Sequence, residues 1–470
     1  MKLIHLSDLH LGKRLHECPL LEDQAYILTQ ILRIAEAERP DAVLIAGDVY
    51  DKPVPPAEAV RLCDGFLTDL AALGCTVLLT SGNHDSAERV GFGAQLLQKS
   101  GVYVSPPYDA GVRPVTLRDE AGEVDFWLLP FLKPALVRHA WAGGEAAGAG
   151  ESAESAAPRA GAEPAGSAKM PPAREPTACA KEVAARGEPA GPAVPCAGAE
   201  AAQGAKMAPE GESAAWAEQA AARGEPAAPA APDLSSYDAA VRYAVAKLPL
   251  RPGVRCVLVA HQFVTGAARC DSEEVTVGGV DNVDAAAFDA FNYVALGHIH
   301  SAQSVGRPAV RYCGTPLKYS FSEAGQQKSV TLVTLGADGV PVITTRPLVP
   351  KREVREVRGS YLELTDPAVY RGTAVEDYLH ITLTDEEEIP EAMGRLRSVY
   401  PNLLRLDYDN RRTREKRQVD GAARPEQKTP LELFKELYEL QNNQPMTAQQ
   451  AVFCETLIHQ VWEEVPPCGR

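Results

Sequence analysis

Two histidines stand two residues apart in Gly297-His298-Ile299-His300, directly after the apolar run Tyr293 to Leu296. The run predicts a buried strand, and side chains at positions i and i+2 of an extended segment point to the same side. Neutral imidazole binds Mn, Fe and Zn, so the pair could form half of a metal site. The same pattern is also typical of two solvent-exposed loop histidines. Other parts of the chain must decide between these two interpretations.

Similar side chains follow other predicted strands. Apolar runs predict strands at residues 3–6, 42–46, 75–80, 254–260 and 291–296, with a later one at 329–335, and helical patterns separate the first three. This order is typical of an α/β layer with parallel strands, in which sites lie at the carboxyl ends of strands. Carboxylate, imidazole and amide side chains stand at the ends of the first five, namely Asp8, His10, Asp48, Asn83, His84, His261, His298 and His300. Their common position predicts one shared metal site.

The types of side chain indicate which metal and which chemistry the site would support. Carboxylate, imidazole and one amide oxygen, without thiolate, suit Mn or Fe better than a structural Zn. One carboxylate can bridge two ions, which then lie about 3.5–4 Å apart. Two such ions polarise a phosphoryl oxygen and generate hydroxide from water near neutral pH. The predicted chemistry is therefore hydrolysis of a phosphoester without a covalent nucleophile.

Four motifs of this chain resemble those of the calcineurin-like metallophosphoesterases. They are Asp8-Leu9-His10, Gly47-Asp48-Val49-Tyr50-Asp51, Gly82-Asn83-His84-Asp85 and Gly297-His298-Ile299-His300, in this order. Within that superfamily, Arg311 to Pro316 and Ser320 to Glu323 resemble stretches of the SbcD family of bacterial nuclease subunits. That family is the counterpart of the eukaryotic and archaeal break-repair nuclease subunit. The resemblance implies a layered α/β sandwich with a small α+β capping domain and a C-terminal helical pair.

The resemblance also implies a role for each site residue. Two divalent metal ions are expected, with Mn²⁺ as the expected species. Asp48 would bridge them, while His84 would contact the scissile phosphate and Asp85 would orient His84. Asp51 stands where some relatives have a second substrate-positioning histidine, so that histidine is absent here. The first ion would be held by Asp8, His10, Asp48 and His300, and the second by Asp48, Asn83, His261 and His298.

The activity implied by the resemblance is that of a DNA repair nuclease. It comprises an ATP-dependent 3'-5' exonuclease on double-stranded DNA and an endonuclease on single-stranded DNA, which open hairpins and blocked ends. The chain has no GxxxxGK[ST] loop, so an SbcC-type ATPase partner with a coiled coil would supply ATP hydrolysis. Two copies of each subunit and a homodimer through the nuclease domain are expected.

Two other functions remain open at this point. A phosphatase or phosphodiesterase of the same superfamily would use the same metals on a small-molecule or protein phosphoester. A non-catalytic structural subunit could also keep the fold. The region after Lys351 favours the nuclease, because a compact phosphatase does not need it.

Composition and spacing predict five parts of the chain. Residues 1–350 form the nuclease domain, and residues 142–232 within it form an insert rich in Ala, Pro, Gly and Glu. Part of the insert repeats after 37 residues. Such a composition predicts disorder, and the insert is either a tolerated surface insertion or a tether. Residues 351–410 form the capping domain, with strands at 378–383 and 403–408 and a helix at 389–399. A basic linker at 411–428 and a helical pair at 429–464 complete the chain.

The helical pair carries recognisable start signals and apolar faces. Thr429-Pro430-Leu431-Glu432 and Thr447 to Gln450 both have the composition of a capping box. Apolar residues recur at helical spacing in each helix, which predicts either mutual packing or a surface for a partner helix. The basic run at 411–417 could contact DNA, but such a run is more often a solvated linker.

Charge and cysteine content restrict the class of protein further. Acidic residues outnumber basic ones by 63 to 47, which gives a net charge of -16. This charge argues against a protein that coats DNA by itself. Ten cysteines without metal-binding spacing are typical of reduced thiols. We therefore expect a cytoplasmic protein without a membrane segment. The family resemblance implies that it is nucleoid-associated.

Overall fold

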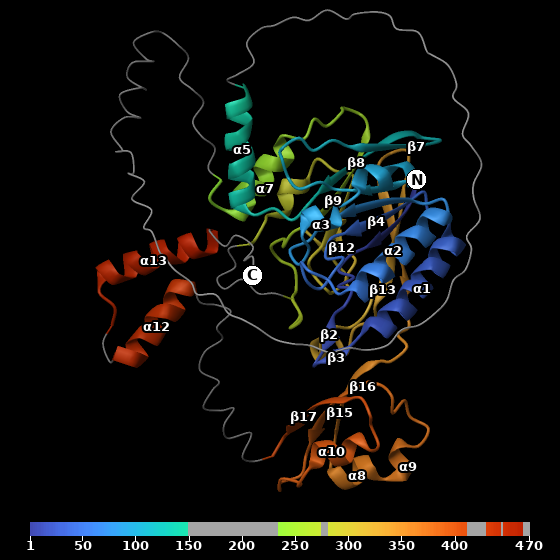
Figure 1. Ribbon diagram of the computed structural model, residues 1–470, viewed down its shortest axis with the longest axis vertical. Helices are drawn as coiled ribbons and strands as arrows, with labels where there is room; N and C mark the ends of the chain where they lie inside the picture. The colour runs from blue at the N-terminus through green and yellow to red at the C-terminus, as the bar shows by residue number, and fades with distance from the viewer. Residues whose placement is uncertain (149–233, 274–280, 411–428, 443–444, 464–470) are drawn as a thin grey trace, which may run out of the picture. The chain divides into compact units, whose positions relative to one another are not determined.

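The computed structural model describes residues 1–148, 234–273, 281–410, 429–442 and 445–463 (Figure 1). No helix within these residues has the length and apolar character needed to cross a membrane. The basic run at 411–417 and nearly all of the insert lie outside them. The first residues of the insert belong to helix α5 (Pro134–Gly148).

The first sheet has six strands in the order β14-β13-β1-β4-β5-β6. The strands are β1 (Lys2–Leu6), β4 (Ala42–Ala46), β5 (Thr76–Thr80), β6 (Val102–Val104), β13 (Ser329–Leu335) and β14 (Pro341–Pro347). Strands β1, β4, β5 and β6 are parallel, and β13 pairs antiparallel with β1. The predicted alternation of strands and helices in the first hundred residues is therefore confirmed.

The second sheet also has six strands, in the order β11-β12-β10-β9-β8-β7. They are β7 (Val115–Asp119), β8 (Gly122–Leu129), β9 (Arg255–His261), β10 (Tyr293–Gly297), β11 (Gln303–Val305) and β12 (Arg307–Tyr312). Strands β8, β9, β10 and β12 are parallel to one another. His261 is the last residue of β9, and His298 directly follows β10.

The two sheets pack face to face because alternate side chains of each strand point to opposite faces. In β4, Leu44 and Ala46 join the apolar cluster between the sheets, which also contains Val257 and Val259 of β9. The other faces are covered by helices: α1 (Leu21–Glu38) and α2 (Ala57–Ala72) on the first sheet, α5 and α7 (Tyr237–Ala246) on the second. The result is the predicted layered α/β sandwich (Figure 1).

Short elements complete this domain. They are β2 (Arg14–Leu15), β3 (Cys18–Pro19), α3 (Ala87–Val90), α4 (Ala94–Leu97), η1 (Gln98–Ser100), η2 (Ala285–Phe288) and η3 (Phe321–Glu323). Phe321 of η3 contacts the capping domain, because its ring centroid is 5.2 Å from that of His380. His16, between β2 and β3, lies against the same phenylalanine, with ring centroids 5.4 Å apart.

The capping domain is a three-stranded parallel sheet with its own core. Its elements are β15 (Val354–Gly359), α8 (Tyr361–Thr365), α9 (Pro367–Tyr370), β16 (Tyr378–Leu383), α10 (Ala392–Arg397) and β17 (Leu403–Tyr408). Leu379 and Ile381 of β16 pack with Leu396 of α10. The helix predicted at 389–399 is shorter than expected. Glu391 has a φ of 55°, a left-handed conformation that interrupts a helix.

The helical pair consists of α12 (Pro430–Asn442) and α13 (Ala448–Glu463). Both predicted capping boxes are present. The Thr429 N–H donates to Glu432 Oε2 at 2.7 Å, and the Glu432 N–H donates to Thr429 Oγ1 at 3.3 Å. Thr447 and Gln450 make the same two bonds at 2.9 and 3.3 Å. These bonds satisfy backbone N–H groups at the start of each helix, which have no hydrogen-bond partner within the helix.

The first turn of α1 connects the two-sheet domain to the capping domain. Asp23 is buried, and its Oδ2 accepts hydrogen bonds from Arg352 Nη1 at 2.7 Å and from the Tyr378 hydroxyl at 2.8 Å. Its neighbour Gln24 is also buried and donates to the His10 carbonyl at 2.7 Å. One helical turn therefore contacts both the capping domain and a predicted metal loop.

We expect Asp23→Ala to destabilise the protein by about 1.5–3 kcal/mol, because Arg352 and Tyr378 would lose a buried charged acceptor. Urea denaturation would measure the loss. The control is Glu22→Ala, which removes an exposed carboxylate that pairs with the same arginine. It should have a smaller effect, since exposed ion pairs contribute little. Equal effects of the two variants would contradict a special role for Asp23.

Candidate metal centre

The strand ends of both sheets meet at one place. Asp48 follows β4 of the first sheet, and His261 ends β9 of the second. His261 Nε2 lies 3.3 Å from Asp48 Oδ2 and 2.9 Å from Asn83 Oδ1. The backbone N–H of His298 donates to Asp8 Oδ1 at 3.0 Å. The structure therefore brings the predicted strand-end residues of the two sheets together.

The loops that carry these residues have strained backbone conformations. Asp8, His10, Asp48 and His298 have positive φ angles of 52°, 44°, 48° and 107°. Such angles are uncommon outside glycine and concentrate at functional sites. Hydrogen bonds hold the first two loops together, because the Asp8 N–H donates to the Gly47 carbonyl at 3.0 Å and the His10 N–H donates to the Asp48 carbonyl at 2.9 Å.

Two glycines permit the close approach of the loops. A Cβ atom on Gly297 would lie 1.8 Å from the Ala46 carbonyl oxygen of the other sheet. A Cβ atom on Gly82 would lie 2.1 Å from Asp48 Oδ1. Real Cβ atoms do not come this close to other atoms, so any side chain at these positions would push the strand ends apart.

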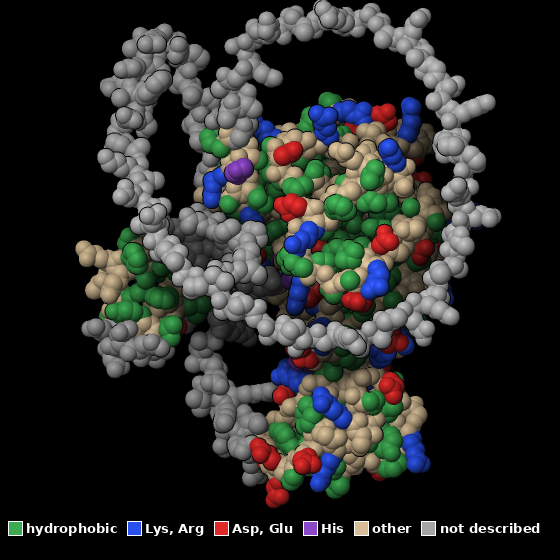
Figure 2. All heavy atoms as spheres, viewed as in Figure 1, with side chains coloured by type: hydrophobic (Ala, Val, Ile, Leu, Met, Phe, Trp, Pro, Cys, Tyr) green, Lys and Arg blue, Asp and Glu red, His purple; other side chains and the backbone are tan. Residues whose placement is uncertain are grey.

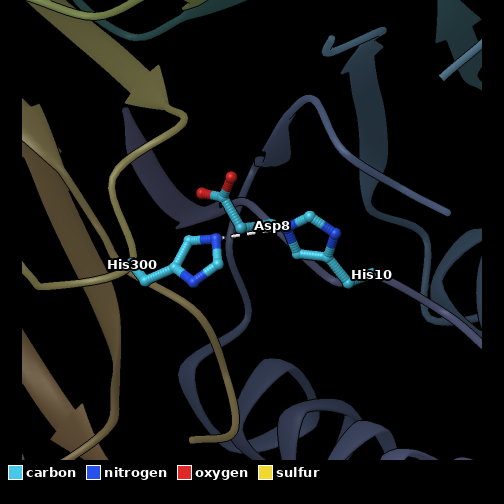
Figure 3. A group of neighbouring side chains, drawn as sticks. All are labelled: Asp8, His10 and His300. Carbon is cyan, nitrogen blue, oxygen red and sulfur yellow. Dashed lines mark hydrogen bonds between the residues drawn. The ribbon is translucent and has the colours of Figure 1, made fainter. Parts of the chain in front are cut away.

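Asp8, His10 and His300 form the first group of possible ligands (Figure 3). All three are buried. The two ring nitrogens His10 Nε2 and His300 Nε2 face each other at 3.2 Å. Burial lowers the pKa of both histidines, which favours the neutral imidazole that binds metals. Burial raises the pKa of Asp8 to about 7, and the Asp48 carboxylate contributes to this rise.

Asn83, His261 and His298 form the second group. The Asn83 Oδ1 atom lies 2.9 Å from His261 Nε2 and 3.0 Å from His298 Nδ1. Burial lowers the pKa of His298 well below its usual value. Burial also opposes the charged form of His261, but the Asp48 carboxylate outweighs it and raises the pKa of His261 to about 9. Asp48 is thus the main electrostatic partner of His261.

Asp48 lies between the two groups. Its Oδ2 is 3.3 Å from His261 Nε2 and 3.6 Å from His10 Nε2. Its Oδ1 accepts a hydrogen bond from the His84 N–H at 2.9 Å. Burial alone would raise the pKa of Asp48, but His261, His10 and His84 hold it well below its usual value. Asp48 is therefore an ionised carboxylate with imidazole nitrogens of both groups around one oxygen.

The donor set fits divalent metal ions. Two buried carboxylates lie among three histidines that burial keeps neutral, and such a cluster needs a cation to balance it. His10 Nδ1 and His298 Nε2 are buried without a hydrogen-bond partner within the described part of the chain. Oxygen and imidazole donors without a thiolate suit Mn or Fe. The residues present could therefore hold two ions with Asp48 between them.

His84 and Asp85 lie at the edge of this group. His84 is half-buried, and its Nε2 is 4.0 Å from Asp48 Oδ2 while its Nδ1 is 3.1 Å from the Asp51 carbonyl oxygen. The Asp85 carboxylate accepts hydrogen bonds from the N–H groups of Val49, Tyr50 and Gly82, each at 3.0 Å. Asp85 thus holds together the two loops that carry Asp48 and His84, and it positions His84 through the backbone.

Several polar residues around the site were not predicted as functional. Gln24 and Tyr319 both contact the Leu9 carbonyl, and Lys13 pairs with Asp51 at 2.8 Å. Behind His300 lie Ser272, Glu273, Glu323 and Lys328. Glu323 belongs to a stretch that carried the family resemblance. No spacing rule indicates the others, because their partners are far away in the sequence.

Comparisons with known proteins show which families this chain resembles. Residues 1–130 match the family model described as calcineurin-like phosphoesterase, and residues 350–442 match the model described as type 5 capsule protein repressor C-terminal domain. The chain is 26% identical over 410 residues to the SbcD component of the nuclease SbcCD from Staphylococcus epidermidis, with 86% of this chain and 85% of that protein covered. A crystal structure of a dimetal phosphatase from Danio rerio is 11% identical with a TM-score of 0.33, over 74% of this chain and 96% of that one. The predicted family resemblance is confirmed.

We expect Asp48→Ala to lose both metal ions, because each group would lose the anionic oxygen that the two groups share. Substitution of a residue that only contacts a ligand typically lowers metal affinity about 10- to 100-fold. The loss of Mn²⁺ affinity in Asp48→Ala should be larger than this. Metal analysis after gel filtration would measure this. Asp64→Ala, an exposed carboxylate on α2, should keep both ions. Two ions retained by Asp48→Ala would contradict the bridging position.

Proposed function

We propose that this chain, a metal-dependent phosphodiester hydrolase with a calcineurin-like phosphoesterase domain, acts on DNA as the nuclease component of a complex with an SbcC-type ATPase. The similarity to a component of a nuclease extends over 86% of the chain and so includes the region after the phosphoesterase domain. A small-molecule phosphatase would not require that region. We infer an ATP-dependent 3'-5' exonuclease on double strands and an endonuclease on single strands and hairpins.

The position of Asp48 Oδ2 between imidazoles of both groups is the observation that best supports two-metal hydrolysis. In this proposal Asp8, His10, Asp48 and His300 hold one ion, and Asp48, Asn83, His261 and His298 hold the other. Mn²⁺ is the ion we propose for both positions. When bound, two such ions would supply Lewis-acid activation of the phosphodiester and of the attacking water.

The proposed mechanism assigns the remaining steps to side chains of this chain. His84 lies beside Asp48 and is half-buried, so its ring can reach a phosphate that approaches from the solvent side. It would stabilise or protonate the leaving oxygen as a general acid. Asp85 would keep His84 in place through the three backbone hydrogen bonds described above.

The C-terminal helical pair is the proposed contact for the ATPase. α12 and α13 expose Phe434, Leu437, Val452, Phe453 and Leu457 by 45–66%, and apolar side chains are visible on both helices in Figure 2. Apolar faces of this kind commonly receive a helix of a partner. We propose that the partner helix belongs to the base of the ATPase coiled coil. Two copies of each subunit, a homodimer through the nuclease domain and a cytoplasmic, nucleoid-associated location are part of the same proposal.

The substrate class can be tested with a DNA hairpin and p-nitrophenyl phosphate, both with Mn²⁺. We expect kcat/KM to be at least about 100-fold higher for the hairpin, because the binding energy of DNA beyond the scissile bond contributes to catalysis. His84→Ala should keep its Mn²⁺ but lose about 10²- to 10⁴-fold in turnover, the range for a general acid. A preference for p-nitrophenyl phosphate would instead support the phosphatase alternative.

The partner surface can be tested in the full chain with Phe434→Ser and Phe453→Ser combined. The double variant should lose co-purification with an SbcC-type ATPase and ATP-stimulated exonuclease activity, but keep single-strand endonuclease activity. Leu362→Ser is the control, since Leu362 is 79% exposed in the capping domain. Truncation after Gln427 should have the same effect as the double variant. Wild-type affinity of the double variant for the ATPase would place the partner surface elsewhere.

A further inference from the structure

Three polar side chains behind His300 have no part in the proposed mechanism. They are Ser272, Glu323 and Lys328, and the last two are almost completely buried. We propose that Ser272 and Glu323 are positioning residues, which hold the His300 ring in the form with its proton on Nδ1 and its lone pair on Nε2. This inference rests on the proposed role of His300 as a metal ligand.

The first step concerns the charge of Glu323. Its Oε2 accepts a hydrogen bond from Lys328 Nζ at 2.6 Å. The other groups that contact the carboxylate are also donors: the Tyr319 N–H at 3.2 Å, and the hydroxyls of Ser320 at 3.1 Å and Thr315 at 3.4 Å. A carboxylate surrounded by donors and paired with a lysine is ionised, and an ionised carboxylate can only accept hydrogen bonds.

The second step concerns the single proton of the Ser272 hydroxyl. Ser272 Oγ lies 2.6 Å from Glu323 Oε1 and 2.7 Å from His300 Nδ1. Because Glu323 can only accept, the hydroxyl must donate its proton to Glu323. Its oxygen can then only accept from His300, so Nδ1 must carry the ring proton.

The third step concerns the opposite side of the ring. A neutral imidazole with its proton on Nδ1 has its lone pair on Nε2. In this structure Nε2 points toward His10 and belongs to the group with Asp8 (Figure 3). Partners of this kind that fix the tautomer of a histidine ligand are common around metal sites.

Glu273, which follows Ser272, and Lys328, which pairs with Glu323, hold the main chain of His300. Its N–H donates to Glu273 Oε1 at 2.7 Å, and its carbonyl accepts from Lys328 Nζ at 2.9 Å. His298 differs, because its Nε2 has no hydrogen-bond partner in the part of the chain that the structure describes. At His300, the ring and the backbone are thus both held by this group of residues.

The proposal can be tested by nitrogen NMR of the full, metal-free chain labelled with ¹⁵N-histidine, with His300→Gln used to assign the His300 signals. The wild-type ring should show a protonated Nδ1 and an unprotonated Nε2. Ser272→Ala should lose this preference, whereas Ser272→Thr keeps the hydroxyl and should restore it. Ser322→Ala is the matched control, since it removes an exposed hydroxyl that binds the Asp271 N–H next to Ser272. Melting curves would confirm that each variant is folded.

Mn²⁺ titration by electron paramagnetic resonance provides the second readout. Ser272→Ala should bind one of two ions about 10- to 100-fold more weakly, the usual effect of losing such a partner. Ser272→Thr and Ser322→Ala should bind like wild type. A wild-type ring protonated on Nε2, or an unchanged tautomer in Ser272→Ala, would overturn the proposal. A tautomer shift with unchanged Mn²⁺ binding would support the positioning role but contradict His300 as a ligand.

Discussion

The site depends on the contact of two sheets at their strand ends. Gly297 of the second sheet lies so close to the Ala46 carbonyl of the first that even a methyl group would not fit. Only this approach lets an imidazole from one sheet, His261, reach a carboxylate from the other, Asp48. The positive φ angles of Asp8, His10, Asp48 and His298 belong to the same constraint, since each loop must turn sharply at its strand end.

Burial determines the electrostatics of the cluster. The chain as a whole is acidic, yet the centre holds few carboxylates and many imidazoles. Burial disfavours charge on each of them, so His10, His298 and His300 are driven to their neutral forms. Asp48 keeps its charge chiefly because His261 lies beside it. The site thus combines the ionised carboxylate of Asp48 with several neutral imidazole nitrogens. This combination suits a doubly charged metal ion better than a proton.

Local sequence patterns predicted the α/β layer and the strand-end residues, whereas the layered sandwich was implied by the family resemblance. Apolar runs located β4 and β13 to the residue, and Asp48 or His298 stood out as polar residues after such runs. Residues such as Gln24 and Ser272 could not be found in this way. Gln24 looks like any polar residue in the first turn of a helix, and its bond to the His10 carbonyl exists only in the folded chain. Ser272 is 28 and 51 residues away from its two partners.

The pairing of β1 with β13 has a consequence for how the molecule is made. Lys2 lies opposite Thr334, so the middle strand of the first sheet stays without one neighbour until more than three hundred residues have been synthesised. Pairings across such long separations slow folding, because the loop must close before the contact stabilises it. His300 emerges late from the ribosome as well. A chain that ends before β13 would therefore lack a complete first sheet, and one that ends before His300 would also lack a complete donor set, so metal-dependent cleavage requires synthesis at least through β13.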